Sequence, residues 1–157
     1  MKEFNSFGAF SKHLLKTATY HGEVTKHLAK TGAEMIEKEA KSRIGYRQEG
    51  WADLAESTKK DKERTGYAFN ADFNPLMRTG ELYASYGSSV ERGTAVAGST
   101  SDVALYQELG SMKTPPREVL RPSAMAQQKK INALIGNGLI AWLSATGFKR
   151  PKKLVGK

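Results

Sequence analysis

The spacing of apolar residues changes along this chain, and the change constrains its fold more than any other feature. Over residues 1–45 apolar side chains recur at the spacing of one helical face, at Val24, Leu28, Met35, Ile36, Ala40 and Ile44. Between residues 82 and 99 the pattern alternates instead, as in a strand, and Arg92-Gly93 supplies the glycine that a tight hairpin turn favours. The chain is therefore predicted to be α+β, with N-terminal amphipathic helices and a small antiparallel sheet.

Residues 1–45 are expected to form a short helix containing Phe10, Leu14 and Leu15 and then a longer one, and a third helix is expected at the C-terminus. His21-Gly22 is a natural break between two of them in residues 1–45, and Gly45 is expected to end the second. Pro122 suits the first turn of a C-terminal helix, which we expect to pack on the sheet. Its apolar stripe is formed by Ala124, Ile131, Leu134, Ile135, Gly138, Leu139 and Trp142. Glycines at 136 and 138 each weaken a helix by about 1 kcal/mol, so close packing against a neighbour would explain them.

The segment after Gly45 is expected to hold a loop and a short basic helix. Trp51 and Leu54 are the natural anchors of the loop in the core. Thr58 with Asp61 three residues later resembles a capping box for the helix. Four cations follow, at Lys59, Lys60, Lys62 and Arg64. They could meet DNA or an acidic neighbour, but acidic residues between them favour a solvated helical face.

Two segments contain candidate interface residues. Aromatic residues in the loop 65–75 could anchor a partner or fold back on the domain's own core; they are Tyr67, Phe69 and Phe73. Ser101 offers an N-cap for a short helix that Gly110 closes, and residues 117–121 can add one more strand.

The connection after that short helix supplies the second set, which consists of Glu108, Leu109, Pro115, Pro116, Arg117 and Arg121. Prolines restrict the free loop and so lower the cost of ordering it against a neighbour. The two arginines could pair with a neighbour's carboxylates. The alternative is that Arg117 caps its own domain.

Charge is concentrated at the C-terminus. The chain has 157 residues and a formal charge of +9, and 39% of its residues are hydrophobic, which is slightly low for a globular protein. Five of the 25 cations lie in the last nine residues, so the remainder has 20 cations against 16 acids. We predict one domain over residues 1–147 and a flexible basic tail over 148–157. The DNA-facing candidates in this tail are Lys149, Arg150, Lys152 and Lys153; a solvated end that aids solubility is the alternative.

Enzyme templates do not match. The absence of cysteine excludes a disulfide framework, a thiolate metal site and a cysteine nucleophile. The three histidines, at 13, 21 and 27, do not share a helical face at ligand spacing. The sequence has no phosphate-cradling glycine loop, serine elbow or HExxH motif. We therefore expect no catalytic, cofactor or metal site. No signal peptide or apolar span is visible, so neither secretion nor membrane insertion is expected.

Five short motifs follow one another between residues 51 and 122. In chain order they are Trp51, Leu54 and Thr58; Leu76, Arg78, Thr79, Gly80, Leu82 and Ser85; Val96, Ala97, Gly98 and Ser99; Tyr106, Glu108 and Gly110; and Pro116, Arg117, Leu120, Arg121 and Pro122. Together they resemble the tail-completion, or head–tail joining, proteins of long-tailed bacteriophages, a family related to the phage virion morphogenesis proteins. The similarity spans roughly residues 25 to 135. Leu109 and Val119 stand where phenylalanines are common, and the loop 65–75 is longer than usual.

The resemblance implies a structural virion protein that joins the tail tube to the head connector. It implies a homo-oligomeric ring, often a hexamer, around the DNA channel, with other phage neck and tail proteins as partners. The expected location is the neck or tail end of the virion, and the host cytoplasm during assembly. A tail terminator that caps the tube is the near alternative. A nucleic-acid-binding module acting through the tail and the cations at 59–64 is the alternative from another class.

Overall fold

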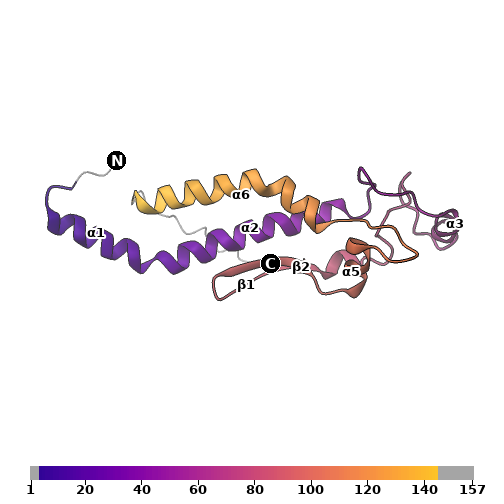
Figure 1. Ribbon diagram of the computed structural model, residues 1–157, viewed down its shortest axis with the longest axis horizontal. Helices are drawn as coiled ribbons and strands as arrows, with labels where there is room; N and C mark the ends of the chain where they lie inside the picture. Colours follow the sequence, from indigo (N-terminus) through magenta and orange to yellow (C-terminus); the bar gives the residue numbers. More distant parts are fainter. Residues whose placement is uncertain (1–3, 145–157) are drawn as a thin grey trace.

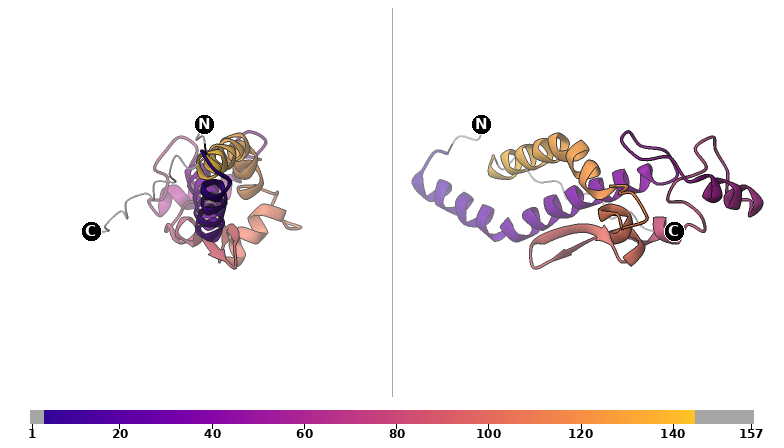
Figure 2. Two further views of the ribbon diagram at one scale, coloured as in Figure 1. Left: turned by 90° about the vertical axis from the view of Figure 1, so that its left-hand side faces the viewer. Right: turned by 45° about the vertical axis from the view of Figure 1, so that its right-hand side comes forward.

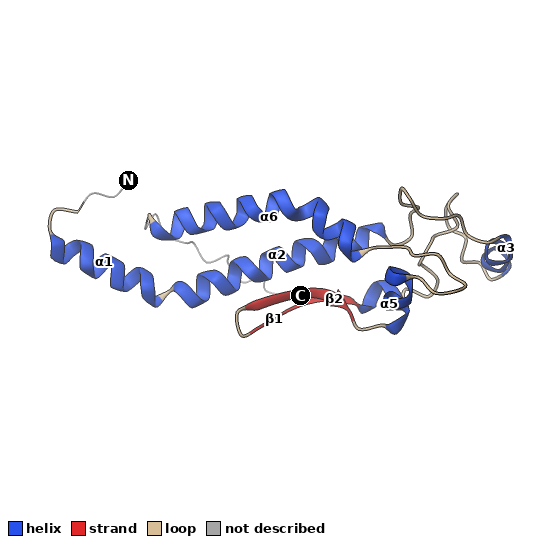
Figure 3. Ribbon diagram, viewed as in Figure 1, coloured by secondary structure: helices blue, strands red, loops and turns tan. Residues whose placement is uncertain are grey.

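The computed structural model describes residues 4–144 and has α+β architecture, as predicted. Its elements in chain order are α1 (Phe7–Thr19), α2 (His21–Arg43), α3 (Glu56–Arg64), α4 (Glu81–Ser85), β1 (Tyr86–Glu91), β2 (Thr94–Ser99), α5 (Asp102–Leu109) and α6 (Leu120–Leu143). Figure 1 shows an elongated molecule in which α2 is the central rod. The short helix α5 lies beside the C-terminal end of α2, α3 lies farther out at the end of the molecule, and α1 extends from the other end of α2 (Figure 3).

The central helix is covered on two opposite sides. The hairpin of β1 and β2 packs on one side of α2, and α6 lies along the other (Figure 2). The α+β class is thus confirmed, but the C-terminal helix packs on α2 and not on the sheet as expected. The reason is that α2 presents apolar residues to both sides, so it separates the hairpin from α6.

Small residues allow α6 to approach α2. A Cβ added to Gly138 would lie 2.5 Å from Cδ2 of Leu28, and one added to Gly32 would lie 3.5 Å from Cγ2 of Ile131. Gln127 of α6 also donates to the Glu39 carboxylate, at 2.9 Å. These contacts explain Gly138, as the sequence predicted, because a side chain there would displace Leu28. Gly136 has no atom within 4 Å of its added Cβ, so packing does not explain it.

The hairpin follows the predicted turn but begins later than the alternating pattern suggested. Tyr86 pairs with Ser99 and Glu91 with Thr94 in an antiparallel register. Arg92 and Gly93 both have positive φ, 47° and 83°, as a two-residue turn of the I′ kind requires. The predicted strand residues before Tyr86 form the helix α4 instead.

The core is small and lies where α2 ends. Its buried members are Ala40, Ile44, Trp51, Tyr86, Ala104 and Val119, with Leu76, Met77, Leu82 and Leu120 packed against them. Trp51 is the predicted anchor and also donates from Nε1 to the Glu118 carbonyl, at 3.3 Å. Leu54 is only half-buried. No helix within residues 4–144 is long and apolar enough to cross a membrane.

Several local predictions from the sequence are confirmed. The first two helices divide at Tyr20, one residue before the expected break. Gly45 follows the end of α2 with φ of 92°. The Ser101 hydroxyl accepts a hydrogen bond from the Val103 amide at 3.2 Å, so it is the N-cap of α5, and Gly110 follows that helix with φ of 77°.

Two local predictions were wrong. Residues 117–121 do not form a strand, because the carboxylate of Glu108 starts α6 at Leu120. Thr58 and Asp61 do not form a capping box, since α3 begins earlier, at Glu56, and has no side-chain cap. Asp61 instead pairs with arginines: its Oδ1 lies 2.8 Å from Nη2 of Arg64.

Candidate functional site

The junction between α5 and α6 is organised by one carboxylate. Glu108 accepts hydrogen bonds from the amides of Val119 at 2.7 Å, Leu120 at 3.0 Å and Arg121 at 3.1 Å. These amides lie at the N-terminus of α6, where a helix has no internal acceptors and carries partial positive charge. The role of Glu108 is therefore internal: it joins α5 to α6. The sequence placed this residue among the interface candidates and missed its capping role, because a cap from another helix has no fixed spacing.

The loop between these helices is tight. Gly110 has φ of 77°, and a Cβ there would lie 3.0 Å from the Pro116 nitrogen and 3.1 Å from the Thr114 carbonyl oxygen. Ser111 and Thr114 exchange backbone hydrogen bonds of 2.8 and 3.2 Å. Pro115 and Pro116 are exposed, so the loop presents both prolines to solvent, as the interface prediction requires.

Arg117 lies inside the molecule and Arg121 outside it. Arg117 is only 7% exposed, and its Nη2 donates to the carbonyls of Ala52 at 3.3 Å and Asp53 at 3.4 Å. Its Nε has no hydrogen-bond partner. Arg117 thus ties the junction between α5 and α6 to the loop after α2. This agrees with the alternative in which Arg117 serves its own domain and not a neighbour. Arg121 is exposed, and its Nη1 lies 3.8 Å from the Glu118 carboxylate.

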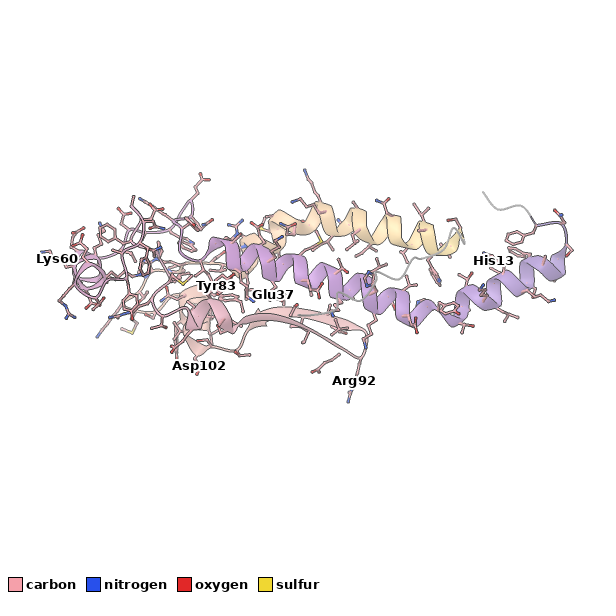
Figure 4. The ribbon with its side chains drawn as sticks, turned by 180° about the vertical axis from the view of Figure 1, so that it is seen from behind. His13, Glu37, Lys60, Tyr83, Arg92 and Asp102 are labelled. Atoms are coloured by element: carbon pink, nitrogen blue, oxygen red, sulfur yellow. The ribbon has the colours of Figure 1, made fainter. Side chains whose placement is uncertain are left out.

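A second buried cation comes from α3. Lys62 is 7% exposed, and its Nζ donates to the carbonyls of Asn74 at 2.7 Å and Met77 at 2.6 Å. Burial lowers the pKa of the Lys62 ammonium, and the charge of Arg78 lowers it further. The prediction of a solvated basic face is therefore wrong for this lysine, because the loop 74–77 folds over it. Lys60 and Arg64 are exposed, and Figure 4 shows Lys60 at the outer end of the molecule.

Arg78, from the second motif, holds the loop against α3. Its Nη2 lies 3.0 Å from Oδ2 of Asp61, and its guanidinium lies over the Tyr67 ring, 5.5 Å from the centroid. Gly80 begins α4 with φ of 90°, a conformation that strains other residues.

The aromatic loop is divided between the two predicted roles. Tyr67 and Phe73 are half-buried, and Phe73 lies under the Lys59 ammonium, 5.8 Å from it. Phe69 is 71% exposed. Asn74 fixes this arrangement by accepting from the Phe69 amide at 2.6 Å. Tyr67 and Phe73 therefore fold back on the protein, whereas Phe69 is exposed to solvent.

These segments enclose a cleft of about 750 Å³ between α3 and α5. Its lining residues are Asp53, Leu54, Ala55, Thr58, Lys62, Leu76, Met77, Arg78, Thr79, Gly80, Glu81, Leu82, Ser101, Val103, Gln107, Lys113, Thr114, Pro115 and Arg117. Both buried cations line it. Four of the five sequence motifs contribute to its walls or to the junction beside it. The sequence did not reveal the cleft, because its walls come from segments far apart in the chain.

The helix α1 turns polar residues inward and apolar residues outward. Thr17 and His13 face the end of α6: Trp142 Nε1 donates to the Thr17 carbonyl at 3.1 Å, and His13 Nε2 lies 3.4 Å from the Leu143 carbonyl. None of the residues of α1 is buried. Its exposed apolar residues are Phe7, Phe10, Leu14 and Leu15. A helix that makes all its contacts within its own chain would turn its apolar side toward the core.

A second exposed apolar surface surrounds α5. Its members are Val103, Leu105, Tyr106, Leu109 and Met112. Leu109, an interface candidate from the sequence, is 73% exposed, and Met112 is fully exposed. Asp102 begins this helix on the outside of the molecule (Figure 4). The sequence missed most of this surface because α5 is short and carries apolar residues on several sides.

Residues 4–144 contain no cluster of three metal-ligating side chains. A hydrogen bond from Lys41 lowers the pKa of the Glu37 carboxyl, and a second from Ser88, at 2.6 Å, adds to the effect. Burial raises the pKa of Tyr86 to about 12, with a further contribution from the charge of Glu108. The four DNA-facing candidates, Lys149, Arg150, Lys152 and Lys153, lie outside the described residues.

The chain matches no protein-family model, no curated protein and no solved structure.

Proposed function

We propose that this protein is a structural subunit of a long-tailed phage virion, a tail-completion or neck component that joins the tail tube to the head connector. The observation that carries the proposal is the order of the five motifs between Trp51 and Pro122. The geometry gives several of their residues a physical role: Glu108 caps α6, Gly110 permits the tight loop between α5 and α6, and Arg78 holds its own loop against α3.

Assembly into a homo-oligomeric ring is part of the proposal. Within residues 4–144 nine hydrophobic residues are buried, whereas eighteen large hydrophobic residues are exposed. Soluble monomers rarely expose extended apolar patches, so the α1 and α5 surfaces fit contact with other subunits. Two different surfaces meeting in a head-to-tail manner generate a closed ring when the rotation closes.

The charge distribution supports contact between these two surfaces. The helix α1 contains Lys12 and Lys16 and no acidic residue. Residues 102–112 contain Asp102 and Glu108 and no cation. A neighbour's α1 would thus bring cations toward an apolar surface that carries Asp102 at its edge. Ring formation would place each subunit's exposed prolines, Pro115 and Pro116, near the same contact.

The test is negative-stain electron microscopy with mass analysis of the full chain, at several concentrations and with phage tail tubes added. Rings, or density at the end of the tube, are the expected result. Leu15→Glu should abolish rings because it puts a carboxylate in the apolar surface of α1. Lys60→Glu, at the far end of the molecule, is the matched control and should leave them intact. A persistent monomer that ignores tubes and binds duplex DNA would contradict the proposal.

A further inference from the structure

The two buried cations in the cleft have no counterion in the described structure. Lys62 and Arg117 are the two charged residues buried within residues 4–144, and neither forms an ion pair there. Carbonyl oxygens accept from both, but Arg117 Nε, in a side chain more than nine-tenths buried, has no acceptor. A buried cation without a paired charge is costly, and an unsatisfied buried donor adds to the cost. An anion in the cleft would supply the missing counter-charge for the two buried cations.

The charges along the cleft also favour an anion. Four cations line it, Lys62, Arg78, Lys113 and Arg117, against the carboxylates of Asp53 and Glu81. The Asp53 carboxylate is already paired with Arg47, at 2.8 Å. The hydroxyl groups on the walls add donors for an oxyanion; they belong to Thr58, Thr79, Ser101 and Thr114.

Most of the remaining wall is apolar. Leu54, Leu76, Met77, Leu82, Val103 and Pro115 contribute to it. A free phosphate or a nucleic-acid backbone would leave these side chains without a partner, since nucleic-acid interfaces are strongly polar and charged. A carboxylate carried on a peptide with apolar side chains would satisfy the cations and cover the apolar wall together. The cleft volume of about 750 Å³ is within the range of sites that hold a few residues of peptide.

We infer that the cleft between α3 and α5 binds an acidic peptide segment of a partner protein, with a carboxylate directed to Arg117 and Lys62 and apolar side chains against Leu76 and Val103. Arg117 lines the cleft, and its guanidinium is held in place by its bonds to the carbonyls of Ala52 and Asp53. The inference rests on the geometry of the cleft and does not depend on the phage assignment.

The test is an NMR titration of the full chain with three probes. They are the blocked peptide acetyl-Leu-Glu-Leu-amide, the same peptide with glutamine in place of glutamate, and inorganic phosphate. The acidic peptide should shift the Arg117 Nε–H resonance and the amides of Gly80 and Thr114, which line the cleft, and the shifts should saturate. The glutamine peptide should bind at least tenfold more weakly, because one charge-assisted contact is worth about a factor of ten or more.

Variants separate the cleft from general charge attraction. Lys113→Gln removes an exposed cation of the cleft and should weaken binding of the acidic peptide two- to fivefold with the fold intact. Lys60→Gln removes an exposed cation of α3 that does not line the cleft and should change nothing. Arg117→Lys keeps the charge but lacks the planar guanidinium that can pair with a carboxylate at two points, and it should weaken binding at least tenfold. Its circular dichroism is compared with wild type.

Three results would overturn the inference. One is equal binding of the glutamine peptide, and another is equal weakening by Lys60→Gln and Lys113→Gln. The third is phosphate producing the same shifts as tightly as the peptide, which would assign the cleft to free or nucleic-acid phosphate. Because the titration involves no tail tubes, its failure would leave the ring experiment unaffected, and a chain that forms no rings could still bind the peptide.

Discussion

Helices α1 and α2 are adjacent in the chain and both carry apolar residues at helical spacing, but apolar residues are buried only in α2. Val24, Leu28, Ala33 and Ala40 of α2 are buried, because α6 and the hairpin cover it from both sides. None of the residues of α1 is buried, and its half-buried side chains are mainly polar. The comparison teaches that an apolar periodicity identifies a face to be covered but not the molecule that covers it.

The largest effect is expected inside α2. Leu28→Ala removes a side chain that is 5% exposed and packs under Gly138. We expect the free energy of unfolding to fall by about 2–5 kcal/mol, from lost burial and the cavity left behind. Urea denaturation followed by circular dichroism measures it. A loss below about 1 kcal/mol would mean that α2 is not covered by α6 as described.

A smaller effect is expected at the junction that positions α6 on α2. Glu108→Ala removes the acceptor of three backbone amides at the start of α6. The expected cost is about 1–2 kcal/mol, the range measured for lost helix caps. Glu118→Ala is the matched control in the same segment, since Glu118 makes only a 3.8 Å contact to exposed Arg121 and should cost less than about 0.5 kcal/mol. Equal losses in the two variants would contradict the capping role.

Alkaline pH should destabilise the fold through Tyr86, on the side of α2 where the hairpin packs. The pKa of Tyr86 is raised to about 12 in the folded protein, from an ordinary value of 10.0. The neutral phenol is the form that the fold favours, so its contribution to stability is complete below pH 10 and is lost as pH rises toward 12. The free energy of unfolding measured between pH 9 and pH 11.5 should therefore fall less in Tyr86→Phe than in wild type. Parallel curves for the two proteins would show that the phenol is not buried.

The smallest effect on the free energy of unfolding is expected in α1, and it tests the difference in burial between α1 and α2. Leu15→Ala should change the free energy of unfolding of the dilute monomer by no more than about 0.5 kcal/mol, because the side chain is 67% exposed. The same variant should weaken self-association, which sedimentation at increasing concentration measures. A monomer destabilised as much as by Leu28→Ala would show that α1 packs on its own chain.

The sequence predicted the features that depend on neighbours in the chain. The hairpin turn at Arg92-Gly93, the N-cap Ser101 and the positive φ after α5 at Gly110 are all confirmed. Each depends on the conformational preference of one or two residues, and that preference acts before any tertiary contact forms. For the same reason Gly45 could be assigned to the end of α2.

Tertiary structure decided what depends on distant segments. The strand predicted at 117–121 became the start of a helix because Glu108, on another helix, caps it. Lys62 was predicted on a solvated face but is buried, because a loop twelve residues later folds over its ammonium. Arg117 donates to carbonyls more than sixty residues away. A sequence pattern carries no information about such partners, because their contacts are set by how the elements pack.

The α+β class and the local turns and caps were thus determined by the sequence alone. The placement of α6 on α2, the cleft between α3 and α5, and the outward apolar face of α1 were decided only by the tertiary structure. The physical reason is that backbone preferences act over a few residues, whereas burial depends on which surfaces the whole chain can bring together.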